Sequence, residues 1–158
     1  MSGVEAAVKI RRMSATDLGP VREIAASLME APHWPILAYV AAIDPENMPR
    51  RIALVAADPG KGTVAGFLVA SLLTPEAELE TIAVAAEGQR RGVGSLLLNA
   101  LLEELRTEEV CQLILEVRAS NRAALGFYGA LGFKETGRRP RYYIDPEEDA
   151  VLMGLRLV

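Results

Sequence analysis

The spacing of hydrophobic and polar residues changes several times along the first half of the chain. Period-two alternation predicts strands over residues 6–13 and 79–85, and two further strands are predicted over residues 52–57 and 64–73, joined by a turn whose composition is typical of a hairpin. In the strand over residues 79–85, one face should hold Leu79, Thr81, Ala83 and Ala85, and the other Glu80, Ile82 and Val84. Helical spacing links Leu18 to Leu28, and a second helix is predicted over residues 34–43. The first half therefore combines two helices with a series of antiparallel strands.

The second half begins with a longer helix. It starts at Val93, because leucines recur there every four residues up to Leu105. A strand over residues 110–117, a short helix capped by Ser120 or Asn121 and ended by Gly132, and strands over 133–138 and 150–158 follow. This order predicts one domain over residues 1–158, of the mixed α/β (α+β) class, built on a single sheet.

The composition is that of an ordinary globular protein, with 158 residues of which 51% are hydrophobic and 24% charged. A net charge of -4 argues against non-specific binding to nucleic acid. The single cysteine, Cys111, and the single histidine, His33, exclude a disulfide framework and a Cys- or His-based metal site, so no metal is expected. We recognise no membrane span and no secretory signal, which makes the cytoplasm the expected compartment.

Candidate chemistry lies first in the turn between the strand that ends near Val84 and the helix that starts at Val93. The turn reads Gln89-Arg90-Arg91-Gly92-Val93-Gly94. Its two glycines let the backbone approach a ligand, and the first amides of a helix favour a phosphate group. The alternative is a plain strand-to-helix turn with surface arginines. The segment is neither a P-loop nor a dinucleotide fingerprint.

Two further polar side chains stand out in apolar surroundings. Alternation places Glu116 opposite the apolar residues of its strand, where a carboxylate is costly unless it is paired or functional. The structural alternative is an ion pair with Arg118 or Arg122. Tyr128 lies seven residues after Asn121 and shares its helix face. A tyrosine in such a position most often packs and makes one hydrogen bond.

Together these segments resemble the GNAT superfamily of acyl-CoA-dependent N-acetyltransferases. The turn at residues 89–94 matches the superfamily's pyrophosphate loop, and residues 82–84 are similar to the strand that pairs with the pantetheine arm. The resemblance implies the GNAT fold, with a mixed, mostly antiparallel sheet of about seven strands and helices on both faces. It also implies acetyl-CoA as co-substrate. The cofactor-binding residues that it implies are Ile82, Ala83, Val84, Gln89, Arg90, Arg91, Gly92, Val93, Gly94, Ser95, Asn121 and Ala124.

A narrower resemblance is to the RimI type of this superfamily, and it rests on residues 115–121, Tyr128 and residues 139–143. It implies acetyl transfer to the N-terminal alanine of a ribosomal protein by direct attack in a ternary complex. Glu116 would be the general base and Tyr128 the general acid. The substrate-binding residues that it implies are Trp34, Glu80, Tyr142 and Tyr143. The order His33-Trp34-Pro35 departs from the RimI pattern, in the half of the chain that shapes the acceptor pocket.

Several alternatives stay open at this point. A small-molecule amine acetyltransferase is a second enzyme class, and a non-catalytic acyl-CoA-binding sensor is a third class, which would not need Glu116 and Tyr128. The expected partners are acetyl-CoA and a peptide or protein N-terminus, without nucleic acid or membrane, in a monomer or a homodimer. Cys111 is expected to be a small buried residue rather than a nucleophile, and His33 is a minor candidate for substrate contact. Tyr142 and Tyr143 line either a solvated strand edge or the peptide cleft.

Overall fold

The computed structural model describes residues 8–28, 34–60 and 62–157, without the side chain of Arg90. His33 and the start of the strand expected at residues 6–13 lie outside these ranges. Seven strands form one sheet in the order β1-β2-β3-β4-β5-β7-β6. Their bounds are β1 Lys9–Arg12, β2 Arg51–Ala57, β3 Val64–Leu73, β4 Glu76–Val84, β5 Gln112–Arg118, β6 Lys134–Tyr143 and β7 Glu148–Arg156. Each neighbouring pair is antiparallel apart from β4 and β5, so the expected mixed, mostly antiparallel sheet is confirmed.

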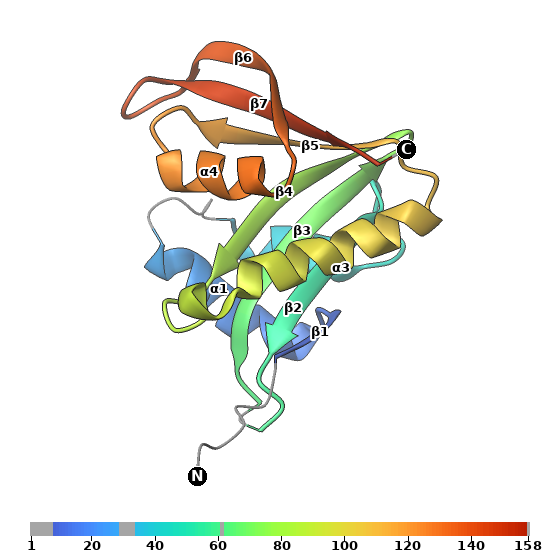
Figure 1. Ribbon diagram of the computed structural model, residues 1–158. Coiled ribbons are helices and arrows are strands. Elements are labelled where there is room, and N and C mark those ends of the chain that lie inside the picture. The colour runs from blue at the N-terminus through green and yellow to red at the C-terminus, as the bar shows by residue number, and fades with distance from the viewer. Residues whose placement is uncertain (1–7, 29–33, 61, 158) are drawn as a thin grey trace.

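Helices cover both faces of the sheet, as expected (Figure 1). Helices α1 (Leu18–Ser27) and α2 (Ile36–Ile43) pack on one face, over a core that includes Tyr39 and Phe67. The longer α3 (Val93–Thr107) lies across β2, β3 and β4 on the opposite face. A second core lies beneath α3, and helix α4 (Arg122–Ala130) packs into it through Tyr128. The sheet therefore separates two apolar cores.

A β-bulge at Glu80 divides β4 into two parts. Val69 of β3 pairs with Thr81, whereas the next residue, Ala70, pairs with Leu79, which leaves Glu80 as the extra residue. Side chains alternate between the two faces of a strand, and an extra residue shifts this alternation by one position. Residues before and after the bulge therefore do not share a single alternating pattern.

The faces expected for this strand are therefore wrong for Leu79 and Glu80, whereas from Thr81 onward the expected alternation is confirmed. Leu79 packs in the core under α3, together with Ile82 and Val84. Ala83 packs in the core under α1 and α2. Glu80 also points to the α1/α2 side, because it pairs with Arg51, whose neighbours on the same face of β2 belong to that core. The bulge thus turns Glu80 and Thr81 to the same side of the sheet.

Three local expectations also differ from the structure. Strand β4 starts at Glu76 rather than at residue 79, because a tight turn at residues 74–75 already leads into pairing with β3. Strand β6 runs on to Tyr143 rather than ending at residue 138, because pairing with β7 extends a segment that has no alternation of its own. Cys111 is exposed rather than buried. Just before β5, its N–H donates a hydrogen bond to the Pro75 carbonyl and its carbonyl accepts one from the Leu157 amide.

The chain before α1 is held by a cluster around Asp17, which is 4% exposed. The Asp17 carboxylate accepts two hydrogen bonds from Arg11, at 2.7 and 2.9 Å, and one from the Ser14 amide at 2.8 Å. The Arg11 hydrogen bonds lower the pKa of Asp17, against the opposing effect of burial. Asp17 therefore fixes the entry into α1 as a buried, charged acceptor.

Candidate active site

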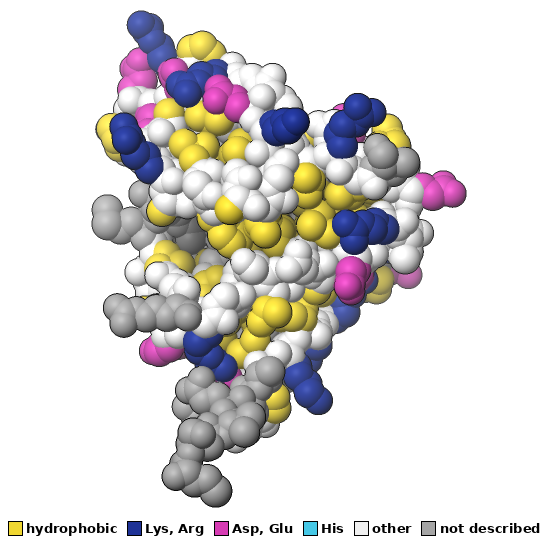
Figure 2. All heavy atoms as spheres, in the orientation of Figure 1, with side chains coloured by type: hydrophobic (Ala, Val, Ile, Leu, Met, Phe, Trp, Pro, Cys, Tyr) yellow, Lys and Arg dark blue, Asp and Glu magenta, His cyan; other side chains and the backbone are white. Residues whose placement is uncertain are grey.

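The candidate site lies where β4 and β5 separate. Parallel pairing joins Glu76, Ala77 and Glu78 to residues 112–114 and extends no further along either strand. Beyond Glu78 the two strands diverge, with α4 next to β5 and the start of α3 next to β4 (Figure 1). Their separation opens a cleft of about 1350 Å³. Figure 2 shows apolar side chains along the band between α3 and α4.

At one end of the cleft the glycine turn leads into α3. Gln89 donates a hydrogen bond from Nε2 to the Val84 carbonyl, 3.1 Å away, which ties the turn to the end of β4. Gly92 has a φ of 70°, in the left-handed region that side chains avoid, and the helix begins at the next residue. A Cβ on Gly94 would stand 3.2 Å from Cζ of Phe127, so the missing side chain also allows α4 to approach.

The turn fits a phosphate group. The first amides of a 15-residue helix have no acceptors within the helix, and its dipole favours negative charge at this end. Arg91 lies near this end but forms an ion pair with Asp58 at 3.0 Å. The Val93 side chain is fully buried beneath the turn, so this residue can contribute its backbone and not its side chain.

Helix α4 forms the next part of the wall. Asn121 caps the helix, because its side chain accepts a hydrogen bond from the Ala124 amide at 3.1 Å. Tyr128 is 7% exposed and packs between Phe127 and Phe133, with ring centroids 5.2 and 5.5 Å away. Burial raises the pKa of Tyr128 to about 12. Its phenol is therefore protonated at neutral pH and can donate a hydrogen bond or a proton into the cleft.

Glu116 lies on β5 on the face expected from the sequence, and its side chain is 21% exposed. Its ion-pair partner is Arg139 of β6, with Nε 3.4 Å from Oε1. The expectation of a pair with Arg118 or Arg122 is therefore wrong: Arg118 pairs with Glu148 and lies 4.2 Å above the Tyr143 ring. The reason is tertiary, because β7 separates β5 from β6 in the sheet and Arg139 reaches Glu116 from beyond it.

The cleft ends among aromatic and acidic side chains. Trp34, Tyr142 and Tyr143 line it, and Glu80 lies there in a half-buried ion pair with Arg51, whose Nε is 2.9 Å from Oε1. All four residues singled out from the sequence as substrate-binding thus face one cleft. Tyr142 and Tyr143 line this cleft, and Tyr142 is at the same time exposed on the edge strand β6.

The structure brings most of the candidate residues together. The cleft is lined by Ile82, Ala83, Val84, Gln89, Gly92, Gly94, Ser95, Glu116, Asn121, Ala124 and Tyr128. Arg91 and Val93 do not line it, and the Arg90 side chain lies outside the described part of the chain. The sequence reasoning did not single out Glu78, Thr81 or Arg51, which also line the cleft. The alternation of glutamates with apolar residues along 76–80 is a signal that could have indicated Glu78; no local pattern indicates the bulge.

Within the described residues, no group of His, Cys, Asp or Glu side chains is arranged to hold a metal ion. Across the same ranges, no helix combines the length and apolar character required to cross a bilayer.

Comparison with known proteins identifies the class. The acetyltransferase (GNAT) family matches residues 21–133, well over half of the sequence. The chain belongs to this family.

Among its relatives is the [ribosomal protein bS18]-alanine N-acetyltransferase of Salmonella typhimurium, which is 46% identical over 94 residues. That match covers 58% of this chain and 64% of the relative, so it spans less than two thirds of the relative's length. Two solved structures match over nearly the whole chain. The ribosomal-protein-S18-alanine N-acetyltransferase of Escherichia coli has a TM-score of 0.81 at 34% identity, covering 95% of this chain and 94% of that one. Ard1 of Thermoplasma volcanium has a TM-score of 0.83 at 31% identity, covering 96% and 99%.

Proposed function

We propose that this protein transfers an acetyl group from acetyl-CoA to a primary amine, the N-terminal alanine amine of a ribosomal protein. The observation that supports it is that Glu116 of β5 and Tyr128 of α4 line one cleft, which a turn suited to a pyrophosphate also lines. The names of the Salmonella and Escherichia relatives support the choice of acceptor. We infer a cytoplasmic enzyme, because a ribosomal protein is its acceptor.

The cofactor end of the cleft holds the acetyl donor in this proposal. The amides at the start of α3 bind the pyrophosphate, and Asn121 and Ala124 line the path of the acyl chain. Acetyl-CoA supplies a thioester, whose carbonyl oxygen gains negative charge as an amine attacks. A backbone N–H of β4 within residues 82–84, beyond the region paired with β5, donates to that oxygen.

The acceptor end supplies proton transfer. An N-terminal amine has a pKa of about 7.7–8.0, so roughly a tenth of it is neutral at pH 7, against far less than a thousandth of a lysine side chain. A carboxylate is therefore a sufficient base, and Glu116 takes the proton directly or through a water molecule. Tyr128 stays protonated because of its raised pKa, and it donates to the departing sulfur. No covalent enzyme intermediate is needed.

The decisive experiment measures thiol release from acetyl-CoA and analyses the acceptors by mass spectrometry. A basic peptide that begins with alanine is compared with polyamines and aminoglycosides. Acetylation of the peptide amine is the expected result. Turnover on a small amine without modification of the peptide would replace the ribosomal acceptor with a small molecule. Binding of acetyl-CoA without thiol release on any acceptor would indicate a sensor.

A further inference from the structure

Three glutamates line the same cleft, and one of them has no partner in the part of the chain that the structure describes. Glu80 pairs with Arg51 at 2.9 Å and Glu116 pairs with Arg139 at 3.4 Å. Among the described residues, Glu78 makes neither a hydrogen bond nor an ion pair. The two arginines therefore leave one negative charge of the cleft without a direct partner.

The surroundings of Glu78 oppose its charge. Burial raises the pKa of this carboxyl, and the charges of Glu116 and Glu80 raise it further, while the charge of Arg139 has a smaller effect in the opposite direction. A partly buried carboxylate that is repelled by two others is stabilised by any cation that reaches it. The cleft thus favours a positively charged group beside Glu78.

A second observation comes from Thr81, which lines the same cleft and is 5% exposed. Its Oγ1 is buried and has no hydrogen-bond partner within the described ranges. The bulge at Glu80 turns Thr81 to the α1/α2 side of the sheet, the side on which Glu80 meets Arg51. A buried hydroxyl without a partner is unfavourable, and an N–H donor from a ligand would satisfy it.

We propose that Glu78 and Thr81 form a subsite for a second cationic group of the acceptor, apart from the amine that is acetylated. A guanidinium or ammonium group suits both residues, because it supplies positive charge to the carboxylate and N–H donors to the hydroxyl. This inference rests on the proposed function and specifies it: the preferred acceptor has a basic group near its N-terminus.

The test uses peptides that begin with alanine and contain a single arginine, moved through the second to fourth positions of an otherwise glutamine-rich sequence. Binding to the CoA-loaded protein and kcat/KM for acetylation are both measured. At one position, arginine should improve binding and kcat/KM by about tenfold over glutamine. Equal values for arginine and glutamine at every position in the unaltered protein would overturn the proposal.

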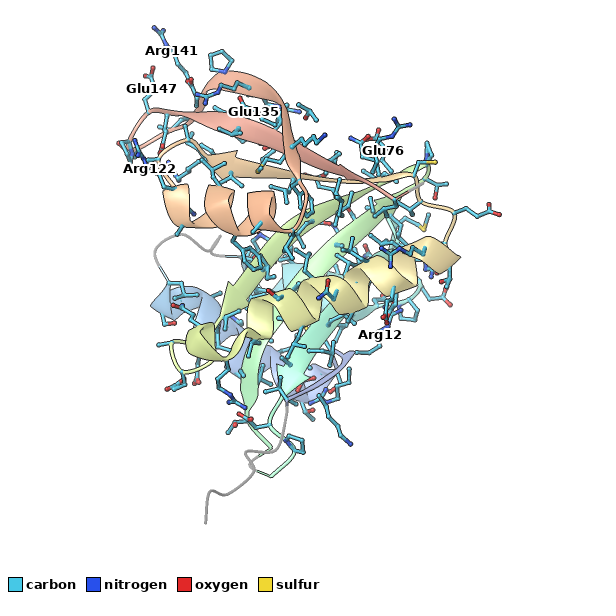
Figure 3. The ribbon with its side chains drawn as sticks, in the orientation of Figure 1. Arg12, Glu76, Arg122, Glu135, Arg141 and Glu147 are labelled. Carbon is cyan, nitrogen blue, oxygen red and sulfur yellow. The ribbon has the colours of Figure 1, made fainter. Side chains whose placement is uncertain are left out.

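Two variants and a control assign the effect to the subsite. Glu78→Gln should reduce the arginine preference to within about twofold, and Thr81→Val should reduce it in part. Glu76→Gln is the matched control, because Glu76 lies on the same strand, is exposed and does not line the cleft (Figure 3). An arginine preference that survives in Glu78→Gln and in Thr81→Val contradicts the subsite.

The binding measurement separates this inference from the proposed function. If the peptides bind with an arginine preference but are not acetylated, the proposed reaction fails and the subsite stands. If they are acetylated without the preference, the reaction stands and the subsite fails. Spermidine, compared with a monoamine of similar length, tests whether a small polycation uses the same subsite; its advantage should also disappear in Glu78→Gln.

Discussion

Arg139 of β6 reaches Glu116 of β5, with Nε 3.4 Å from Oε1, so the proposed base is already paired before an acceptor enters. The Arg139 side chain is 56% exposed, and its guanidinium lies 5.4 Å from the Tyr142 ring at the cleft wall. Such an arrangement orients the carboxylate while water still screens the pair.

The first prediction concerns how much the ion pair between Arg139 and Glu116 contributes to catalysis. An ion pair this exposed contributes at most about 1 kcal/mol, so Arg139→Ala should change kcat/KM by no more than about fivefold. Glu116→Gln, which removes the base, should lower kcat by about 10²-fold or more. Steady-state kinetics on the alanine peptide measure both values.

Arg141→Ala is the matched control for Arg139→Ala. Arg141 lies on the same strand and pairs with Glu147 at 3.1 Å near the end of the β6–β7 hairpin (Figure 3), and it does not line the cleft. Its removal should leave kcat/KM unchanged. A loss for Arg139→Ala as large as that for Glu116→Gln would show that the guanidinium contacts the reacting atoms.

Removal of the Tyr128 hydroxyl tests the proposed acid. Tyr128→Phe should lower kcat by about 10²-fold and leave acetyl-CoA binding nearly intact, because the ring still packs against Phe127 and Phe133. Since burial raises the pKa of Tyr128 to about 12, its acid form persists through neutral and mildly alkaline pH. Tyr128 should therefore cause no decline in kcat on the alkaline side below about pH 10.

Tyr39→Phe provides the comparison, because Tyr39 is buried in the core under α1 and α2 and its hydroxyl has no partner among the described residues. This variant should keep its full rate. Unchanged turnover in Tyr128→Phe would remove Tyr128 from the acid role.

The glycine turn can be tested by separating affinity from stability. In Gly94→Ala the new Cβ would meet Phe127 at 3.2 Å and push α4 away from the start of α3. The Kd for acetyl-CoA should rise about tenfold, although alanine favours a helix over glycine by about 1 kcal/mol. Calorimetric binding and thermal melts measure the two effects.

Gly126→Ala serves as the control, because nothing lies within 4 Å of a Cβ at that position of α4. It should raise the free energy of unfolding by about 0.5–1 kcal/mol without changing the affinity. If both variants lower the affinity equally, the contact with Phe127 is not the cause.

Because Asp17 is a buried, charged acceptor, the free energy of unfolding should depend on pH. The folded-state pKa of Asp17 is lowered chiefly by the Arg11 hydrogen bonds, so its contribution is present above the unfolded pKa of about 3.9 and is lost as pH falls through the lower, folded value. Asp17→Asn should reduce the free energy of unfolding at pH 7 by about 1–3 kcal/mol. The difference from the unaltered protein should shrink below about pH 4.

Urea unfolding at several pH values measures this difference, with Glu23→Gln on the exposed side of α1 as the control. A difference that stays constant down to pH 2 would mean that the Asp17 charge does not stabilise the folded state.

Much of this protein can be predicted from local sequence. Repeated leucines from Val93 onward define α3, and strict alternation around Glu116 defines β5 and the face of that carboxylate. The glycine turn can likewise be predicted from the sequence. The left-handed backbone at Gly92 and the start of the helix depend on neighbouring residues alone. These features are set by backbone geometry over a few residues.

The acceptor end of the cleft depends on the tertiary structure. The bulge at Glu80 follows from pairing with β3, and it alone turns Thr81 to the same side as Glu80. The partner of Glu116 is Arg139, 23 positions further along the chain, because the strand order β5-β7-β6 sets β6 beyond β7. Register and strand order arise from contacts between distant segments, which no local periodicity encodes. The sequence alone therefore determined the elements and the glycine turn at the proposed acetyl-donor end, whereas pairing between strands decided what surrounds the proposed acceptor end.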